Sequence, residues 1–213
     1  MSSYTIPSVI ESTPRGERVS DIFSRLLSER IVFVGTPIDD GVANVVIAQL
    51  LHLAAGSPDH DIHLYLNSPG GSSTATLAIY DTMRHVSPDV ATICVGQAGS
   101  TAAILLAAGA PGKRTILEHA RVVLDQPHSD VRRGALSDLA VEAAELGRTR
   151  QEWEELLAAH TGRSVDRVHG DIDRTLVLKG PEAVDYGIVD AVAAVSGGEQ
   201  LDARTSAPLR PDA

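Results

Sequence analysis

The sequence predicts an α/β fold in which strands and helices alternate along the chain. Two observations lead to this prediction. First, 43% of the 213 residues are hydrophobic but only 3% are aromatic, so the core must consist mainly of Ala, Val, Leu and Ile. Second, segments with the alternating pattern of a strand are followed by segments with apolar residues at helical spacing. Repeated strand-then-helix units imply a parallel sheet with helices packed outside it.

The elements follow in order from the N-terminus. Residues 1–18 are polar and interrupted by Pro7 and Pro14, so we expect a flexible arm there. Residues 42–53 carry apolar side chains at helical spacing, and residues 61–66 alternate as a strand does. After a turn at 67–72, the remaining predicted elements are a helix over 74–84, a strand over 90–95, a helix over 100–108 and short strands over 115–117 and 121–124.

The segment 136–160 is long, charged on one side, and ends at Thr161-Gly162, which predicts a helix with a glycine stop. Either a helix that projects to meet a partner or a solvated surface helix explains it. A short helix over 181–186, begun by proline, and a last strand over 188–192 follow. We therefore expect a domain over 19–195 and a disordered tail over 196–213.

Composition and charge exclude several function classes. The net charge of −10 and the pI near 5.2 argue against binding to nucleic acid or to an anionic membrane surface. Cys94 is the only cysteine, so no intrachain disulfide is possible, and its apolar surroundings predict a small buried side chain rather than a catalytic thiol. The N-terminus has no secretory signal pattern, and no apolar run reaches eighteen residues. We expect a cytoplasmic protein.

Ser100 is the strongest candidate for a catalytic residue. It follows a predicted strand, precedes a predicted helix, and lies among small side chains over 96–103. Amide N–H groups at such a strand-to-helix turn can stabilise an oxyanion. The turn at Gly70-Gly71 also ends a strand and opens a helix, although a tight turn that only needs positive φ explains it equally well. A serine nucleophile still requires a base.

Several motifs occur in a fixed order along residues 4–192. They are RGER at 15–18, SRLLSERI at 24–31, YLNSPGGS at 65–72, AIYDTM at 78–83, GQA at 96–98, QP at 126–127, HTG at 160–162 and EAVDYG at 182–187. In these motifs and their spacing the chain closely resembles the ClpP family, the barrel-forming proteolytic subunit of the ATP-dependent Clp protease.

The resemblance implies a crotonase-like α/β subunit that forms seven-membered rings, two of which stack through a long handle helix around a proteolytic chamber. AAA+ unfoldases dock outside and feed in unfolded polypeptides; no cofactor and no metal are expected. On this pattern the segment 136–160 is the handle helix, and the arm over 1–18 is the axial pore loop. Ser100 matches the nucleophile, and Gly71 and Thr101 match the oxyanion donors.

Two departures from the family pattern affect catalysis. Asp125 stands where the family has its general-base histidine, before Gln-Pro, and Thr175 stands where it has the orienting aspartate, after Asp173-Arg174. A carboxylate is a poor base for an alcohol and, while ionised, has no proton for the leaving amine. Loss of the base in a serine hydrolase reduces turnover by roughly 10⁴- to 10⁶-fold. Bulky and charged residues at 128–134 replace the small, glycine-rich residues of the family's cleft wall.

Two histidines could in principle replace the missing base. His128 lies three residues after Asp125 but beyond a proline, and His119 lies six residues before it, about 20 Å along a strand. We interpret both as surface histidines. The pair His60 and His63 lacks a third ligand at useful spacing and does not predict a metal site.

Other positions concern assembly. The resemblance implies that Asp173 and Arg174 lock the two rings together through ion pairs. It also places the unfoldase-docking pocket around positions 63, 65 and 85, where many family members carry aromatic residues. Here these are His63, Tyr65 and His85, so docking on this face is expected to be weak or altered.

The leading hypothesis is a catalytically impaired ClpP-like subunit that assembles, in homo- or hetero-oligomeric rings, with an active paralogue. The alternative is an active ClpP-type serine endopeptidase that uses Ser100 with a non-standard base or with activation by a partner ring. A third interpretation, acyl-CoA chemistry, is suggested only by the crotonase-like fold, and fold does not determine function.

Overall fold

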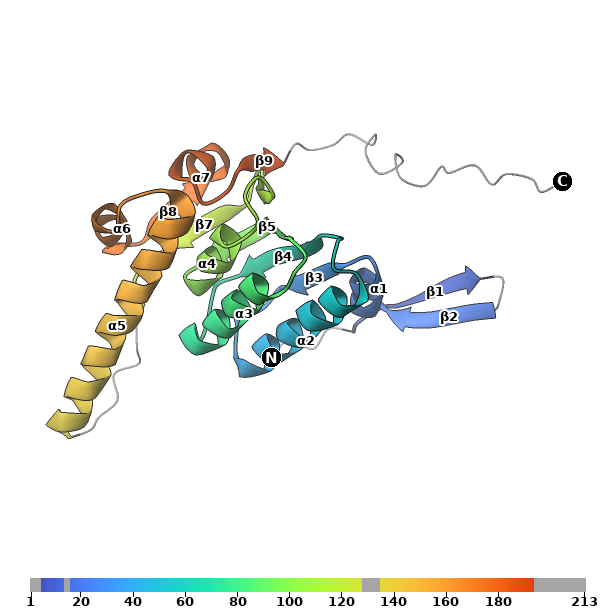
Figure 1. The fold of residues 1–213 in the computed structure, drawn as a ribbon, viewed down its shortest axis with the longest axis horizontal. Helices are drawn as coiled ribbons and strands as arrows, with labels where there is room; N and C mark the ends of the chain where they lie inside the picture. Colours follow the sequence, from blue (N-terminus) through green and yellow to red (C-terminus); the bar gives the residue numbers. More distant parts are fainter. Residues whose placement is uncertain (1–4, 14–15, 128–134, 194–213) are drawn as a thin grey trace.

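A mixed α/β arrangement around one seven-stranded sheet forms the body of the molecule in the computed structural model (Figure 1). The structure describes residues 5–13, 16–127 and 135–193. The strands of this sheet are β3 (Ile31–Val34), β4 (Ile62–Ser68), β5 (Val90–Gly99), β6 (Arg114–Leu117), β7 (Arg121–Leu124), β8 (Leu176–Lys179) and β9 (Ala191–Ala193). The helices are α1 (Ile22–Ser28), α2 (Asp40–Gly56), α3 (Ser73–His85), α4 (Thr101–Ala107), α5 (Leu136–Thr161), α6 (Val165–Ile172) and α7 (Gly180–Tyr186).

The predicted parallel sheet is confirmed for most of its strands. The order β3-β4-β5-β6-β9 is parallel throughout, and β7 also pairs in parallel with the last residues of β5. Only β8 departs from the prediction, because it pairs antiparallel with β7. The sheet therefore branches along β5, and the part of β5 that pairs with β7 ends directly before Ser100.

Helices cover one face of the sheet, and their apolar side chains build the core. On β4 the alternate residues Ile62, Leu64 and Leu66 are buried, as the alternating sequence pattern predicted. Helices α2, α3 and α4 pack side by side against this face (Figure 1). All seven residues of α4 are buried, so the segment that follows Ser100 is anchored in the core.

Two predicted elements have different bounds in the structure. The strand predicted over 90–95 continues to Gly99, because the small residues that suggested a turn pair with β7. The strand predicted over 188–192 is wrong in its first half. Ile188 and Val189 are buried outside any strand, and β9 begins only at Ala191. Four elements, α1, β3, α6 and β8, have no counterpart among those predicted from the sequence.

The N-terminal segment contains a hairpin that the expected flexible arm did not include. Strands β1 (Ser8–Thr13) and β2 (Gly16–Asp21) pair antiparallel and extend away from the body (Figure 1). The cross-strand pair Ile10 and Val19 is exposed on this hairpin. The tail predicted over 196–213 lies outside the described residues.

The predicted long helix is confirmed as α5, which extends well beyond the body (Figure 1). Its C-terminal part packs into the core through Trp153, Leu157 and Ala158, whereas Val141 on its N-terminal half is 68% exposed. The helix ends at Gly162, which has the left-handed φ of 74° that favours glycine.

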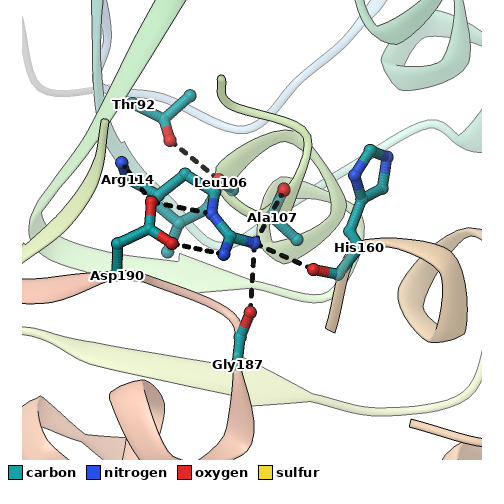
Figure 2. Close-up of polar contacts among 7 residues, drawn as sticks. All are labelled: Thr92, Leu106, Ala107, Arg114, His160, Gly187 and Asp190. Carbon is teal, nitrogen blue, oxygen red and sulfur yellow. Dashed lines mark hydrogen bonds and ion pairs between the residues drawn. The ribbon is translucent and has the colours of Figure 1, made fainter. Parts of the chain in front are cut away.

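Arg114 ties the C-terminal elements to the core (Figure 2). Its guanidinium binds the Asp190 carboxylate through Nε at 3.1 Å and Nη2 at 2.5 Å. Nη1 donates to three carbonyl oxygens, those of Ala107 at 3.3 Å, His160 at 3.0 Å and Gly187 at 3.0 Å. One side chain thereby joins the ends of α4, α5 and α7 to β6.

None of the helices in the described part of the chain has both the length and the apolar character needed to cross a membrane.

Candidate active site

Ser100 lies at the junction of β5 and α4 in a strained backbone conformation. Its φ is 50° and its ψ is −122°, a region that non-glycine residues rarely adopt. The Ser100 amide donates to Val123 O at 2.8 Å, and its carbonyl accepts from the Ala103 amide at 3.1 Å. Such strain costs of order 1–3 kcal/mol and occurs often at functional sites. The geometry agrees with the predicted strand-to-helix turn.

The two glycine turns singled out in the sequence pack against each other. Gly70 has a φ of 97°, and a Cβ on it would lie 2.6 Å from Gly99 O and 2.9 Å from Ser100 Cβ. A Cβ on Gly99 would lie 2.8 Å from Pro69 O. Since there is no room for a side chain on either turn, both glycines are required for close approach, and Gly70 is required for positive φ as well.

The two predicted oxyanion donors have different environments. The Gly71 amide donates to Thr101 Oγ1 at 3.1 Å, and this oxygen also accepts from Thr76 Oγ1 at 2.9 Å. The Thr101 amide, by contrast, has no hydrogen-bond acceptor within the described residues. Only one of the two amides is therefore available to an added oxyanion in this conformation.

Asp125 and Thr175 are brought together by the antiparallel pairing of β7 and β8. Leu124 pairs with Leu176, so the next facing positions along the ladder are Asp125 and Thr175. Both line a cavity of about 420 Å³. The other lining residues are Gln126, Ile172, Asp173 and Arg174.

Ser100 and Asp125 are not joined by a hydrogen bond. Within residues 5–13, 16–127 and 135–193, no group hydrogen-bonds to the Ser100 hydroxyl. Asp125 Oδ1 is buried and has no partner. In this conformation the carboxylate at the expected position of the base accepts no hydrogen bond from the serine hydroxyl.

Neither candidate replacement histidine is placed beside Ser100. His119 lies in the exposed turn between β6 and β7, two residues before Arg121. Arg121 pairs with Gln97, which is three strand residues, or roughly 10 Å, before Ser100. His128 and the cleft-wall segment 128–134 lie outside the described residues.

A polar network connects α5 to the wall of the cavity. Arg150 donates to Gln126 Oε1 at 2.8 Å and to Glu154 Oε1 at 2.8 Å, and it lies 3.7 Å from Asp173 Oδ1. Gln126 Nε2 donates to Asp173 O at 3.2 Å. The exposed guanidinium of Arg174 has no ion-pair partner among the described residues. Arg150 and Glu154 were not predicted as part of the site, because Gln126 and Asp173, through which they join it, are distant in the chain.

The predicted docking residues lie on two elements. His63 and Tyr65 alternate with the buried residues of β4 and so lie on the face opposite the helices, where they are partly exposed. His85 is the exposed last residue of α3. A larger apolar cavity, of about 680 Å³, lies between α1, β3 and α2 and is lined by Val45 and by Phe33, which pairs with Tyr65 across β3 and β4.

His60 and His63 are not part of a metal centre in this structure. Among the described residues, no three His, Cys, Asp or Glu side chains are grouped so that they could bind a metal ion. Burial raises the pKa of the Cys94 thiol to about 11, so this side chain is a neutral thiol at physiological pH.

Comparison with known proteins identifies the family. A family model described as Clp protease matches residues 14–196. The chain belongs to the Clp protease family. The resemblance read from the sequence motifs is thereby confirmed at the level of the family.

Individual relatives of this Clp protease family member are similar over nearly their whole length. The ATP-dependent Clp protease proteolytic subunit 2 of Streptomyces avermitilis is 58% identical over 192 residues, which cover 90% of this chain and 96% of that protein. Proteolytic subunit 4 of Rhodococcus jostii is 59% identical over 194 residues, covering 91% and 100%. A putative proteolytic subunit-like protein of Streptomyces coelicolor is 55% identical over 190 residues, covering 89% and 90%.

Proposed function

We propose that this chain is a catalytically impaired subunit of an ATP-dependent Clp protease that assembles with an active paralogue. The observation that carries the proposal is the lack of a proton acceptor on the Ser100 hydroxyl within the described residues, although Asp125 is only two residues beyond the strand position that binds the Ser100 amide. Assembly and degradation of unfolded polypeptides are the activities to which such a subunit contributes.

The chemistry of the site supports impairment. Peptide hydrolysis requires a base that takes the proton from the serine hydroxyl and then delivers it to the leaving amine. Asp125 accepts no hydrogen bond from that hydroxyl, and the Thr175 hydroxyl cannot replace an orienting carboxylate. With only oxyanion donors and substrate binding remaining, we expect a turnover roughly 10⁴- to 10⁶-fold below that of an intact triad.

The surface supports a role in an assembly. Val141 on the projecting part of α5 is 68% exposed, and Phe33 and Val45 are 39% and 57% exposed beside the apolar cavity. These side chains would be covered by neighbouring subunits in rings of the Clp type. Arg174, which forms no ion pair with any residue that the structure describes, and the exposed Asp173 are available for contacts between rings.

The rest of the proposed assembly follows the family. The subunit would have a crotonase-like fold, α5 would act as the handle helix in ring stacking, and residues 1–18 would line the axial pore. An AAA+ unfoldase would dock near His63, Tyr65 and His85, in a cytoplasmic complex. The relatives carry names with subunit numbers 2 and 4, which supports the presence of several Clp proteolytic subunits in one organism.

One observation favours the alternative of an active endopeptidase. Ser100 has a strained φ of 50° and packs closely against the Gly70 turn, and such backbone strain is typical of active sites. A ring partner that moved a histidine or Asp125 toward this hydroxyl would give an active subunit, and the following experiment separates the two functions.

The test uses the chain together with an active proteolytic subunit from the same organism. Native mass measurement of the mixture should show complexes that contain both subunits, and peptidase activity should be unchanged by Ser100→Ala in this chain. Inactivation of the partner's own catalytic serine should abolish the activity. A monomeric chain in the presence of the partner, or a strong loss of activity with Ser100→Ala, would contradict the proposed function.

A further inference from the structure

The hydroxyl of Thr101 occupies a position where it binds one of the two predicted oxyanion donors. Thr101 and Thr76 are buried, with exposed fractions of 0% and 1%. Thr101 Oγ1 accepts hydrogen bonds from the Gly71 amide at 3.1 Å and from Thr76 Oγ1 at 2.9 Å. The Gly71 amide is therefore already satisfied by the protein before any substrate binds.

The turn that carries Gly71 is held on its other side as well. Ile38 N donates to Gly70 O at 2.9 Å, and Ser72 N donates to Ile38 O at 2.8 Å. A Cβ on Gly71 would lie 2.1 Å from Ile38 O, which shows how closely the two backbones approach. Because this clamp fixes the peptide plane, the amide does not turn from Thr101 to a new acceptor without breaking bonds to Ile38.

The position of Thr101 is equally fixed. It is the first residue of α4, whose seven residues are all buried, and its hydroxyl lies between α3 and the glycine turn. Loss of the Gly71 hydrogen bond would leave this buried oxygen with fewer donors, which is unfavourable. The Gly71–Thr101 contact is therefore stable on both sides.

We propose that Thr101 is a positioning residue that withholds the Gly71 amide from the oxyanion site. The subunit would then have a second impairment, independent of the missing base. This inference rests on the proposed function, because it takes Ser100 as the nucleophile position. Removal of one oxyanion donor typically reduces turnover by about 10²- to 10³-fold, so release of the Gly71 amide should recover a measurable part of that factor.

The experiment measures how well the site stabilises a tetrahedral oxyanion. A peptide boronic acid forms a bond between boron and Ser100 Oγ as the hydroxyl proton leaves to solvent, and the resulting anionic boronate places an oxygen toward the oxyanion donors. The dissociation constant of the peptide boronic acid is measured for the natural sequence and for a variant that carries Asp125→His and Thr175→Asp, and these two proteins are the backgrounds for further substitutions. The substitutions compared in each are Thr101→Val, Thr101→Ser, Thr76→Val and the pair Thr76→Val with Thr101→Val.

Thr101→Val keeps the shape of the side chain and removes the hydroxyl, so it should tighten boronate binding at least tenfold. The double variant Thr76→Val with Thr101→Val should tighten binding equally. It shows that the gain does not come from the Thr76 hydroxyl, which loses its acceptor in Thr101→Val alone. With Thr101→Ser or Thr76→Val the dissociation constant should stay within about threefold of that of the background, since both variants keep the hydrogen bond from the Gly71 amide to the hydroxyl of residue 101. In the background with His and Asp restored, Thr101→Val should raise kcat with little change in KM, a split that a purely structural role would not give.

The inference would be overturned if, in both backgrounds, Thr101→Val bound the boronate no more tightly than the protein that keeps Thr101. So would equal gains from Thr101→Ser, which keeps the hydroxyl. The outcome is separate from that of the proposed function, which fails if the peptidase activity of the mixture with the partner depends on Ser100 of this chain or if the chain does not assemble with the partner.

Discussion

Asp125 and Thr175 face each other one step beyond the last pair, Leu124 and Leu176, of the β7–β8 ladder. Both side chains line the same cavity of about 420 Å³, beside the strand end that binds the Ser100 amide. Two residues that are fifty positions apart in the chain are therefore neighbours in space. Under the proposed function, the loss of the base and of the orienting residue is one local change.

Restoration of both residues should produce an active enzyme. Asp125→His with Thr175→Asp places an imidazole next to a carboxylate at facing positions, where the carboxylate can orient the ring. Hydrolysis of a fluorogenic peptide should rise at least 10²-fold over the natural sequence, and Asp125→His alone should give a smaller gain. Addition of Ser100→Ala must abolish the activity; hydrolysis that persists without Ser100, or no gain from the double substitution, would argue against the site.

The Gly71 turn should tolerate no side chain. In Gly71→Ala the new Cβ would lie 2.1 Å from Ile38 O, so the backbone must shift, and we expect a loss of about 3 kcal/mol in the free energy of unfolding. The matched control is Gly147→Ala, in the exposed part of α5, where a Cβ meets nothing within 4 Å. That change should stabilise the helix by about 0.5–1 kcal/mol. Urea unfolding at one fixed protein concentration measures both. A neutral Gly71→Ala would contradict the packing described here.

Arg114 should be one of the most important polar side chains for stability. Its side chain and that of Asp190 are only 12% and 24% exposed. Arg114→Leu would leave three carbonyl oxygens without the guanidinium donor, and the Asp190 carboxylate would lose its ion pair and keep backbone amide donors such as that of residue 114. We expect a loss of about 3 kcal/mol in urea unfolding. Lys113→Ala is the control, since Lys113 forms ion pairs at the surface and should have a much smaller effect. Equal losses in the free energy of unfolding from the two substitutions would show that the buried Arg114 contacts stabilise the fold no more than the surface ion pairs of Lys113 do.

His160 should make stability depend on pH. Burial, together with the positive charges of Arg84 and Arg114, lowers the pKa of its imidazole below the ordinary 6.5. Neutral Nε2 lies 3.0 Å from the Tyr80 hydroxyl. A lowered pKa in the folded state means that this contribution to stability is complete above about pH 6.5 and is lost as the pH falls through the folded-state pKa.

Urea unfolding between pH 5 and 8 tests this dependence. The natural sequence should lose stability toward pH 5, and His160→Gln should lose less. Asp190 does not interfere: burial alone would raise its pKa, but hydrogen bonds and charge from Arg114 lower it overall, so its contribution is lost only below about pH 4. The same slope in both proteins would exclude His160 as the titrating group.

Sequence patterns predicted the body of the fold because its elements depend on local periodicity. The alternation in residues 61–66 and the helical spacing in 42–53 match β4 and α2 within a few residues. The hairpin β1–β2 was missed because Pro7 and Pro14 suggested an irregular segment, whereas strand pairing is a non-local property. The length of β5 was missed for the same reason, since its glycine-rich end becomes a strand only by pairing with β7.

The site was predictable in part. Ser100 and the Gly70-Gly71 turn were recognised from their local setting, and the structure places them in contact. The bond between the Gly71 amide and the Thr101 hydroxyl was not predicted, because it joins residues thirty positions apart and depends on the approach of two turns. The orientation of Asp125 depends likewise on the β7–β8 register and on burial, which single-residue reasoning does not give.

The most direct measurement is labelling of the purified chain alone by a fluorophosphonate probe, with Ser100→Ala as the control and with peptide hydrolysis measured on the same samples. If the Ser100 hydroxyl has no base, labelling and hydrolysis should both stay at the level of Ser100→Ala. Rapid labelling that disappears in Ser100→Ala, accompanied by turnover of the peptide, would contradict the account.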